Sequence, residues 1–159
     1  MNFQDLSTLR PDLAFIAHWV PQGAHVLDVG CGDGAMLRYL QSGKNCSGYG
    51  IEIADDSLLA STRRGINVIQ QDMEKGLSIF SDNSFDTVLC LSSLQMMQQV
   101  EPLLRDIVRV GHEAIVSFPN FAYWPHRVAL VNGKPVSFLP NLRGSLAVFR
   151  LRKKSQGLP

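Results

Sequence analysis

Two patterns of apolar and polar positions alternate along this chain, namely short apolar runs and segments with the spacing of a helix. Short apolar runs predict strands at residues 24–29, 47–53, 66–70, 84–91 and 113–118, with residues 145–151 as one further candidate. Between the runs, helical spacing predicts helices at residues 9–20, 35–40, 55–64 and 100–110. Strands that alternate with helices indicate parallel strands joined by right-handed crossovers. The pattern therefore predicts an α/β fold.

The first predicted strand runs into a loop with glycine at every second position. Residues 26–34 read VLDVGCGDG, and helical spacing starts directly after them. The three glycines allow positive φ and let a ligand approach without a Cβ in the way, while the following helix points free N–H groups into the same space. The loop predicts a small-molecule site, and the alternative is a turn that merely requires glycine.

Acidic residues at the loop bear on the charge of the ligand. A dinucleotide fingerprint reads G-x-G-x-x-G and cradles an anionic pyrophosphate. This loop reads G-x-G-x-G, with Asp28 just before it and Asp33 inside it. Two carboxylates would repel a pyrophosphate but suit a ligand with a positive amino group and a positive sulfonium. The loop therefore favours S-adenosylmethionine.

Two later acids lie where a nucleotide site would need them. Glu52 ends the second predicted strand, 20 residues beyond Gly32, about where a ribose-binding carboxylate belongs in a βαβ site. Asp72 follows the third strand and can accept a hydrogen bond from an adenine amino group. Ligands in such sheets bind at the carboxyl ends of the strands, so we expect these acids beside the glycine loop. The alternative for Glu52 is a solvent-exposed acid at a strand end.

Composition is that of one globular domain. The chain has 159 residues, of which 45% are hydrophobic and 18% charged. No apolar run approaches the roughly 20 residues that cross a bilayer, and the N-terminus lacks the features of a signal peptide. We therefore expect a cytoplasmic protein with no membrane partner. Cys31, Cys46 and Cys90 match neither a zinc site nor a disulfide framework, so no metal is expected.

The net charge of +1 hides an asymmetry. Residues 114–159 carry 7 basic residues and no acid, whereas residues 1–113 carry 14 acids and 8 basic residues. A basic end is typical of proteins that bind nucleic acid or an acidic partner, and also of a solvated tail. The solvated tail is the favoured interpretation, and nucleic acid is not expected as a partner.

Several motifs together resemble the class I S-adenosylmethionine-dependent methyltransferases, namely residues 26–34, Glu52, Asp72 and residues 84–91. Within that class the chain is similar to the MetW family of methionine biosynthesis proteins. The similarity covers roughly residues 9–140, and its most specific motifs are SFPNF at residues 117–121 and the pair Tyr123-Trp124.

This resemblance implies a three-layer α/β/α Rossmann-like sandwich with a mostly parallel sheet. It implies that Asp28 and the loop at residues 30–34 meet the methionyl part of the cofactor, Glu52 the ribose and Asp72 the adenine. The whole expected cofactor-binding set is Asp28, Gly30, Cys31, Gly32, Asp33, Gly34, Glu52, Ile53, Asp72, Met73 and Leu91. Residues 1–140 form the expected domain. Residues 141–159 diverge from the family as a basic, partly disordered end. Two interpretations are open, namely that the last antiparallel strands are truncated or that the sequence of this end is altered.

Two functions remain open. One is a protein of methionine biosynthesis that binds S-adenosylmethionine and works with or regulates homoserine O-acyltransferase, a partner that the resemblance implies. The alternative is an active methyltransferase that acts on a small molecule and releases S-adenosylhomocysteine. Residues 92–95 read SSLQ, without the Asp/Asn-Pro-Pro-aromatic motif of amino-methylating enzymes. Asn120, Tyr123 and His126 are the polar candidates nearby, although a loop cap is the favoured interpretation of Asn120 and a surface residue that of His126. No catalytic residue is assigned.

Overall fold

The computed structural model describes residues 11–119 and 146–152. The helices are α1 (Pro11–Trp19), α2 (Ala35–Lys44), α3 (Asp55–Arg63) and α4 (Val100–Val110), with two short 3₁₀ helices, η2 (Met73–Lys75) and η3 (Leu94–Met96). The strands are β1 (His25–Val29), β2 (Ser47–Glu52), β3 (Val68–Gln70), β4 (Phe85–Leu91), β5 (Gly111–Pro119) and β6 (Leu146–Arg152). No helix among the described residues is long and apolar enough to cross a membrane.

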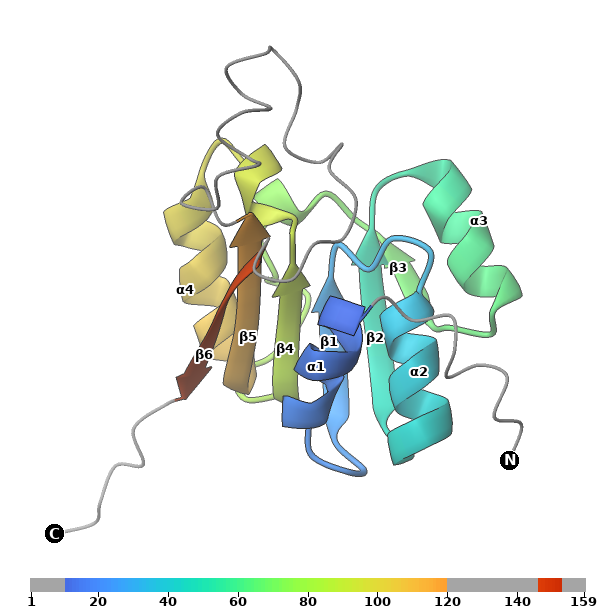
Figure 1. Ribbon diagram of the computed structural model, residues 1–159. Helices are drawn as coiled ribbons and strands as arrows, with labels where there is room; N and C mark the ends of the chain where they lie inside the picture. Colours follow the sequence, from blue (N-terminus) through green and yellow to red (C-terminus); the bar gives the residue numbers. More distant parts are fainter. Residues whose placement is uncertain (1–10, 120–145, 153–159) are drawn as a thin grey trace, which may run out of the picture.

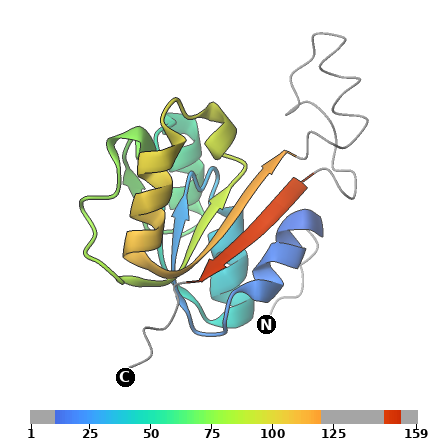
Figure 2. The same cartoon turned by 90° about the vertical axis from the view of Figure 1, so that its left-hand side faces the viewer.

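All six strands form one sheet in the order β3-β2-β1-β4-β5-β6 (Figure 1). The first five are parallel to one another, and β6 runs antiparallel to β5. Helices α1 and α2 cover one face and α4 the other, with the sheet between them (Figure 2). This confirms the predicted three-layer sandwich with a mostly parallel sheet.

Apolar side chains fill the space on both faces of the sheet. On the face of α1 and α2, Ile16 and Leu40 from the helices meet Leu89 and Ile115 from the strands, all fully buried. On the face of α4, Leu103 and Ile107 pack with the alternate strand residues, which point to this face, such as Val88. Buried parallel strands are apolar on both sides, which is why they read as continuous apolar runs in the sequence.

Gly48 lets β1 and β2 approach each other in the middle of the sheet. It pairs with Val26, and its φ of +143° is one that L side chains rarely adopt. A Cβ at this position would lie 1.8 Å from the carbonyl oxygen of Val26, which is far inside any allowed contact. The close pairing of these two strands, which carry the glycine loop and Glu52, therefore requires glycine here.

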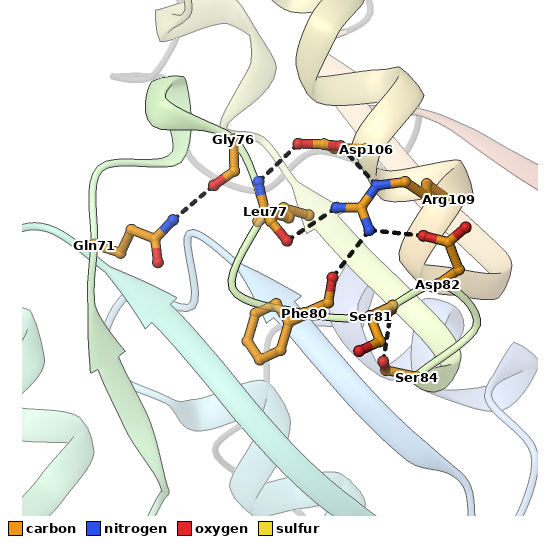
Figure 3. A network of polar contacts seen from close by, with 9 residues as sticks. All are labelled: Gln71, Gly76, Leu77, Phe80, Ser81, Asp82, Ser84, Asp106 and Arg109. Atoms are coloured by element: carbon orange, nitrogen blue, oxygen red, sulfur yellow. Dashed lines mark hydrogen bonds and ion pairs between the residues drawn. The ribbon is translucent and has the colours of Figure 1, made fainter.

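Arg109 ties the segment between β3 and β4 to helix α4 (Figure 3). Its guanidinium donates to the carbonyl oxygens of Leu77 at 3.0 Å and Phe80 at 2.9 Å, and to the carboxylates of Asp82 at 2.9 Å and Asp106 at 3.0 Å. Asp106 accepts in turn from the backbone N–H of Leu77 at 2.7 Å. That bond, followed by the bond to Arg109, lowers the pKa of Asp106. One helix residue thus holds a whole connecting segment against the fold.

Candidate functional site

The glycine loop between β1 and α2 lies at the carboxyl edge of the sheet (Figure 1). Gly30, Gly32 and Gly34 have φ of +78°, +55° and +75°, so all three positions have the left-handed conformation that favours glycine. The N–H groups of Gly30 and Cys31 both donate to the carbonyl oxygen of Ile51 at 2.9 Å. The loop is therefore fixed to the end of β2 through its main chain.

Glu52 joins this loop to the turn that follows β2. Its Oε2 accepts from the N–H of Gly32 at 2.9 Å, and its Oε1 accepts from the N–H groups of Ile53 at 2.8 Å and Ala54 at 2.9 Å. A carboxylate oxygen can accept two hydrogen bonds, so Oε1 is filled. Among the described residues Oε2 accepts one, and it keeps a position for a hydroxyl of a ligand.

Asp28 lies on β1 directly beneath the loop and is 3% exposed. Burial, and then the nearby charge of Glu52, raises the pKa of Asp28 from 3.8 to about 7. The carboxyl group therefore changes its charge close to neutral pH. A positive group placed above the loop would favour its ionised form.

We expect stability to depend on Asp28 in a defined pH window. Between pH 3.8 and about 7 the folded protein holds a proton that the unfolded chain has released, so stability falls as pH rises through this range. Asp28→Asn cannot titrate and so lacks this fall in stability. The unfolding free energy of the variant minus that of the parent should therefore increase by about 2 kcal/mol between pH ~5 and pH ~8 in denaturant titrations. If the difference in unfolding free energy between variant and parent stays constant between these pH values, the raised pKa of Asp28 is wrong.

Asp33, the second acid of the loop, is engaged on the side of α3. Its Oδ1 accepts from the N–H of Ala35 at 3.1 Å, and its Oδ2 pairs with Arg64 at 2.8 Å. Both partners of this ion pair are about half exposed, so the pair adds little stability. The two acids expected around a positive ligand thus have different surroundings. Asp28 is buried under the loop, whereas Asp33 precedes α2, accepts from its first N–H group and pairs with Arg64.

Asp72 and Met73 lie where β3 passes into η2. Asp72 uses Oδ1 to accept from the N–H of Glu74 at 3.0 Å, which caps the 3₁₀ helix. Met73 is buried and lies over the glycine loop, because a Cβ on Gly30 would come within 2.9 Å of its Cε. The same Cβ would lie 2.4 Å from Oγ of Ser93, which follows β4. The segments that follow β1, β3 and β4 therefore meet at Gly30.

Two serines outside the expected cofactor-binding set help to build the site. The buried Ser61 of α3 donates to the carbonyl oxygen of Gly32 at 2.7 Å. Ser93 is also buried and donates to the carbonyl oxygen of Leu91 at 3.2 Å. Only the position of Ser93, directly after a strand that ends at the site, was a signal in the sequence. Ser61 lies inside a helix and gave none.

The remaining members of the expected set differ in exposure. Ile53 is 55% exposed beside Glu52, and Leu91 is partly buried at the end of β4. The side chain of Cys31 lies beneath β2, where a Cβ on Gly50 would come within 2.4 Å of its sulfur. Burial raises the pKa of the Cys31 thiol to about 12, so it stays protonated and packs as a core residue. Its main-chain N–H donates to the carbonyl oxygen of Ile51, and its thiol donates to the carbonyl oxygen of Gly32 at 3.7 Å.

The structure thus brings part of the expected set together. Gly32 and Glu52 are bonded directly, Asp28 lies within electrostatic reach of Glu52, and Met73 contacts Gly30. Asp33 and Asp72 are at the same edge but bond to other partners. Asn120, Tyr123 and His126, the polar candidates for substrate contact, lie outside the described residues.

Comparison with known proteins places this chain in a family. A family model described as methionine biosynthesis protein MetW matches residues 10–142. The bifunctional methionine biosynthesis protein MetXA/MetW of Rhodopirellula baltica is 41% identical over 124 residues, which are 73% of this chain and 20% of that protein. This chain therefore spans about a fifth of the length of that relative.

Solved structures agree on the fold. A SAM-dependent methyltransferase from Thermotoga maritima superposes with a TM-score of 0.65 at 21% identity, covering 76% of this chain and 56% of that one. A methyltransferase from Haloferax volcanii was solved in complex with the Trm112 methyltransferase activator. It superposes with a TM-score of 0.65 at 19% identity, covering 84% of this chain and 64% of that one. At such identity the likeness shows the methyltransferase fold alone.

Proposed function

Because this chain belongs to the MetW family of methionine biosynthesis proteins, we propose that it binds S-adenosylmethionine and works with or regulates homoserine O-acyltransferase. The observation that carries the first half is the bond between Glu52 and Gly32. This bond places a carboxylate oxygen with one open hydrogen-bond position against Gly32, where a Cβ would have nothing within 4 Å and where the loop leaves space for a ligand.

The chemistry of the site fits this cofactor. Glu52 would accept a ribose hydroxyl through Oε2, and the backbone of the loop at residues 30–34 would lie along the methionyl part. Asp28 would balance positive charge above the loop, because its buried carboxyl group ionises close to neutral pH. Asp72 would meet the adenine. When bound, the cofactor supplies a methyl group on a positive sulfonium.

Calorimetric titration with S-adenosylmethionine and S-adenosylhomocysteine tests this proposal. We expect both to bind, and we expect Glu52→Gln to weaken binding by about 10- to 100-fold, because the hydrogen bond to a charged acceptor is lost. Glu101→Gln is the matched control, since Glu101 is an exposed acid of α4 that pairs with Arg105. Thermal melts show whether each variant is folded. If neither ligand binds the parent protein, the proposal fails.

The partnership is supported by the relative from Rhodopirellula baltica, which is a bifunctional MetXA/MetW protein. A single polypeptide holds its two parts at high effective concentration, which is useful when the parts act together. We expect this chain to co-purify with the homoserine O-acyltransferase encoded in the same genome. The bound cofactor would then report the output of the pathway to the acyltransferase. If the two proteins associate neither in co-purification nor in titration, the proposed partnership is wrong.

An active methyltransferase is the second candidate. It is favoured by the fold, which is shared with SAM-dependent methyltransferases, and by Ser93 at Gly30, where the loop after β4 meets the glycine loop. Incubation with labelled cofactor and a cell extract would then yield a methylated product. Repeated absence of a labelled product in extracts with bound cofactor would exclude this candidate.

A further inference from the structure

Strand β6 forms one edge of the sheet. It pairs with β5 along its whole length, from Glu113 opposite Arg152 to Pro119 opposite Leu146. Among residues 11–119 and 146–152, no strand pairs with its other side. An edge of this kind presents main-chain N–H and C=O groups that can pair with a further strand.

The side chains of β6 make one face of this edge apolar. Phe149 lies opposite Val116 and Leu151 opposite Ala114, so each pair shares a face of the sheet. The two β5 residues are buried, whereas Phe149 is 50% and Leu151 41% exposed. A hollow of about 140 Å³ continues the apolar face toward α4, and Val108 and Leu151 contribute to its lining. Helix α4 thus covers β5 but leaves β6 partly uncovered.

The other face of the edge is apolar at Leu146 and Val148 and basic at Arg150 and Arg152. Arg150 and Arg152 both bond to Oε2 of Glu113, at 2.9 Å and 2.6 Å. Two guanidinium groups share one buried carboxylate, so the group keeps a net positive charge. The Arg152 side chain is 64% exposed and can reach a further carboxylate. Apolar and basic residues therefore alternate over the last four residues of β6, 149–152.

We propose that this edge docks an extended segment of the homoserine O-acyltransferase in which acidic residues alternate with apolar ones. The proposal rests on the partnership proposed above and names the surface for it. Main-chain pairing with β6 supplies affinity, apolar side chains cover Phe149 and Leu151, and carboxylates meet the arginines. This is the part of the basic C-terminal end that the structure describes.

Charge decides between such a partner and a second copy of this chain. Two copies paired through β6 in one continuous sheet would place both sets of Arg150 and Arg152 on the same face of neighbouring strands. Like charges across neighbouring strands destabilise the pairing. An acidic segment instead neutralises the excess charge, so the edge selects against its own copy.

A titration of the full chain with purified homoserine O-acyltransferase tests the docking surface. Phe149→Lys and Leu151→Lys should each raise the Kd at least about 10-fold, because each places a charge in the apolar contact. Phe149→Leu keeps the face apolar and should bind within about 3-fold of the parent. Phe15→Lys is the matched control, since Phe15 is 59% exposed on α1, and it should leave the Kd unchanged. Raising salt from about 50 to about 300 mM should weaken the parent complex.

Each outcome has one meaning, provided that thermal melts and cofactor titrations show the variants to be folded. If the parent does not bind the acyltransferase, the proposed partnership fails, and this surface fails with it. If the parent binds and both lysine variants bind equally well, only the docking surface is overturned. A dimer of the protein alone that Phe149→Lys dissociates would assign the edge to a second copy. Slow hydrogen exchange at every amide of β6 in the protein alone would assign it to the chain's own residues.

Discussion

Replacing Gly48 by alanine is expected to lower the free energy of unfolding by about 3–5 kcal/mol, or to prevent folding altogether. The added Cβ would lie 1.8 Å from the carbonyl oxygen of Val26, and backbone atoms in the middle of a sheet cannot turn aside as a side chain can. The φ of +143° adds backbone strain for any L residue. Urea titration followed by circular dichroism measures the effect.

Gly43→Ala is the matched control for this prediction. Gly43 lies in α2, is exposed, and has nothing within 4 Å of the position of a Cβ. Alanine at this position should raise the free energy of unfolding by up to about 1 kcal/mol, because glycine is a poor helix former. If Gly48→Ala changed stability as little as Gly43→Ala, the close pairing of β1 and β2 would be wrong.

Arg109→Met is expected to lower the melting temperature by roughly 5–10 °C. Methionine keeps most of the apolar stem but removes every donor, so two carbonyl oxygens and two carboxylates lose a partner. The segment between β3 and β4 would lose its connection to α4. Because this segment begins at Asp72 and Met73, cofactor affinity should fall as well.

Two further variants separate the geometry of Arg109 from its charge. Arg109→Lys keeps the charge but not the planar fork, and it should recover less than half of the loss. Arg105→Met lies on the same helix, where Arg105 forms an exposed pair with Glu101, and it should change the melting temperature by no more than about 2 °C. Equal losses for Arg109→Met and Arg105→Met would contradict the network.

Most of the sheet could be predicted because buried parallel strands read as apolar runs. The prediction for residues 84–91 differs from β4 by one residue, and α4 was predicted with its observed bounds. Strand β5 begins two residues before the prediction, at Gly111, because Gly111 pairs with Phe85 of the neighbouring strand. Strand pairing of this kind is a tertiary contact and leaves no trace in the local pattern.

Helix α2 is longer than its apolar pattern. The prediction ended at residue 40, whereas the helix continues to Lys44 and ends at Asn45, whose φ is +53° and whose N–H donates to the carbonyl oxygen of Leu40. The four added residues are polar or small, and Lys44 donates from its ammonium group to carbonyl oxygens at the end of α1. Hydrophobic periodicity detects the apolar turns of a helix and misses a last turn without apolar residues.

The candidate site could be predicted in outline but not in its contacts. Spacing alone placed Glu52 beside the glycine loop, because a strand end and a loop one crossover apart meet at the same edge. The bonds of Asp33 to Arg64 and of Ser61 to Gly32 join residues about 30 positions apart through α3. Such partners depend on how a helix packs back on the sheet. The roles of the expected residues toward the cofactor stay predictions.

Glu52 also bears on the entropy of ligand binding. Three N–H groups hold its carboxylate, so its rotamer freedom is already lost when the protein folds. A hydroxyl that arrives at Oε2 meets a fixed acceptor, and no side chain has to be ordered at that moment. The side-chain entropy of Glu52 is therefore lost on folding and not on ligand binding. The hydrogen bond between Oε2 and the ligand then contributes to affinity without an entropy loss of this side chain.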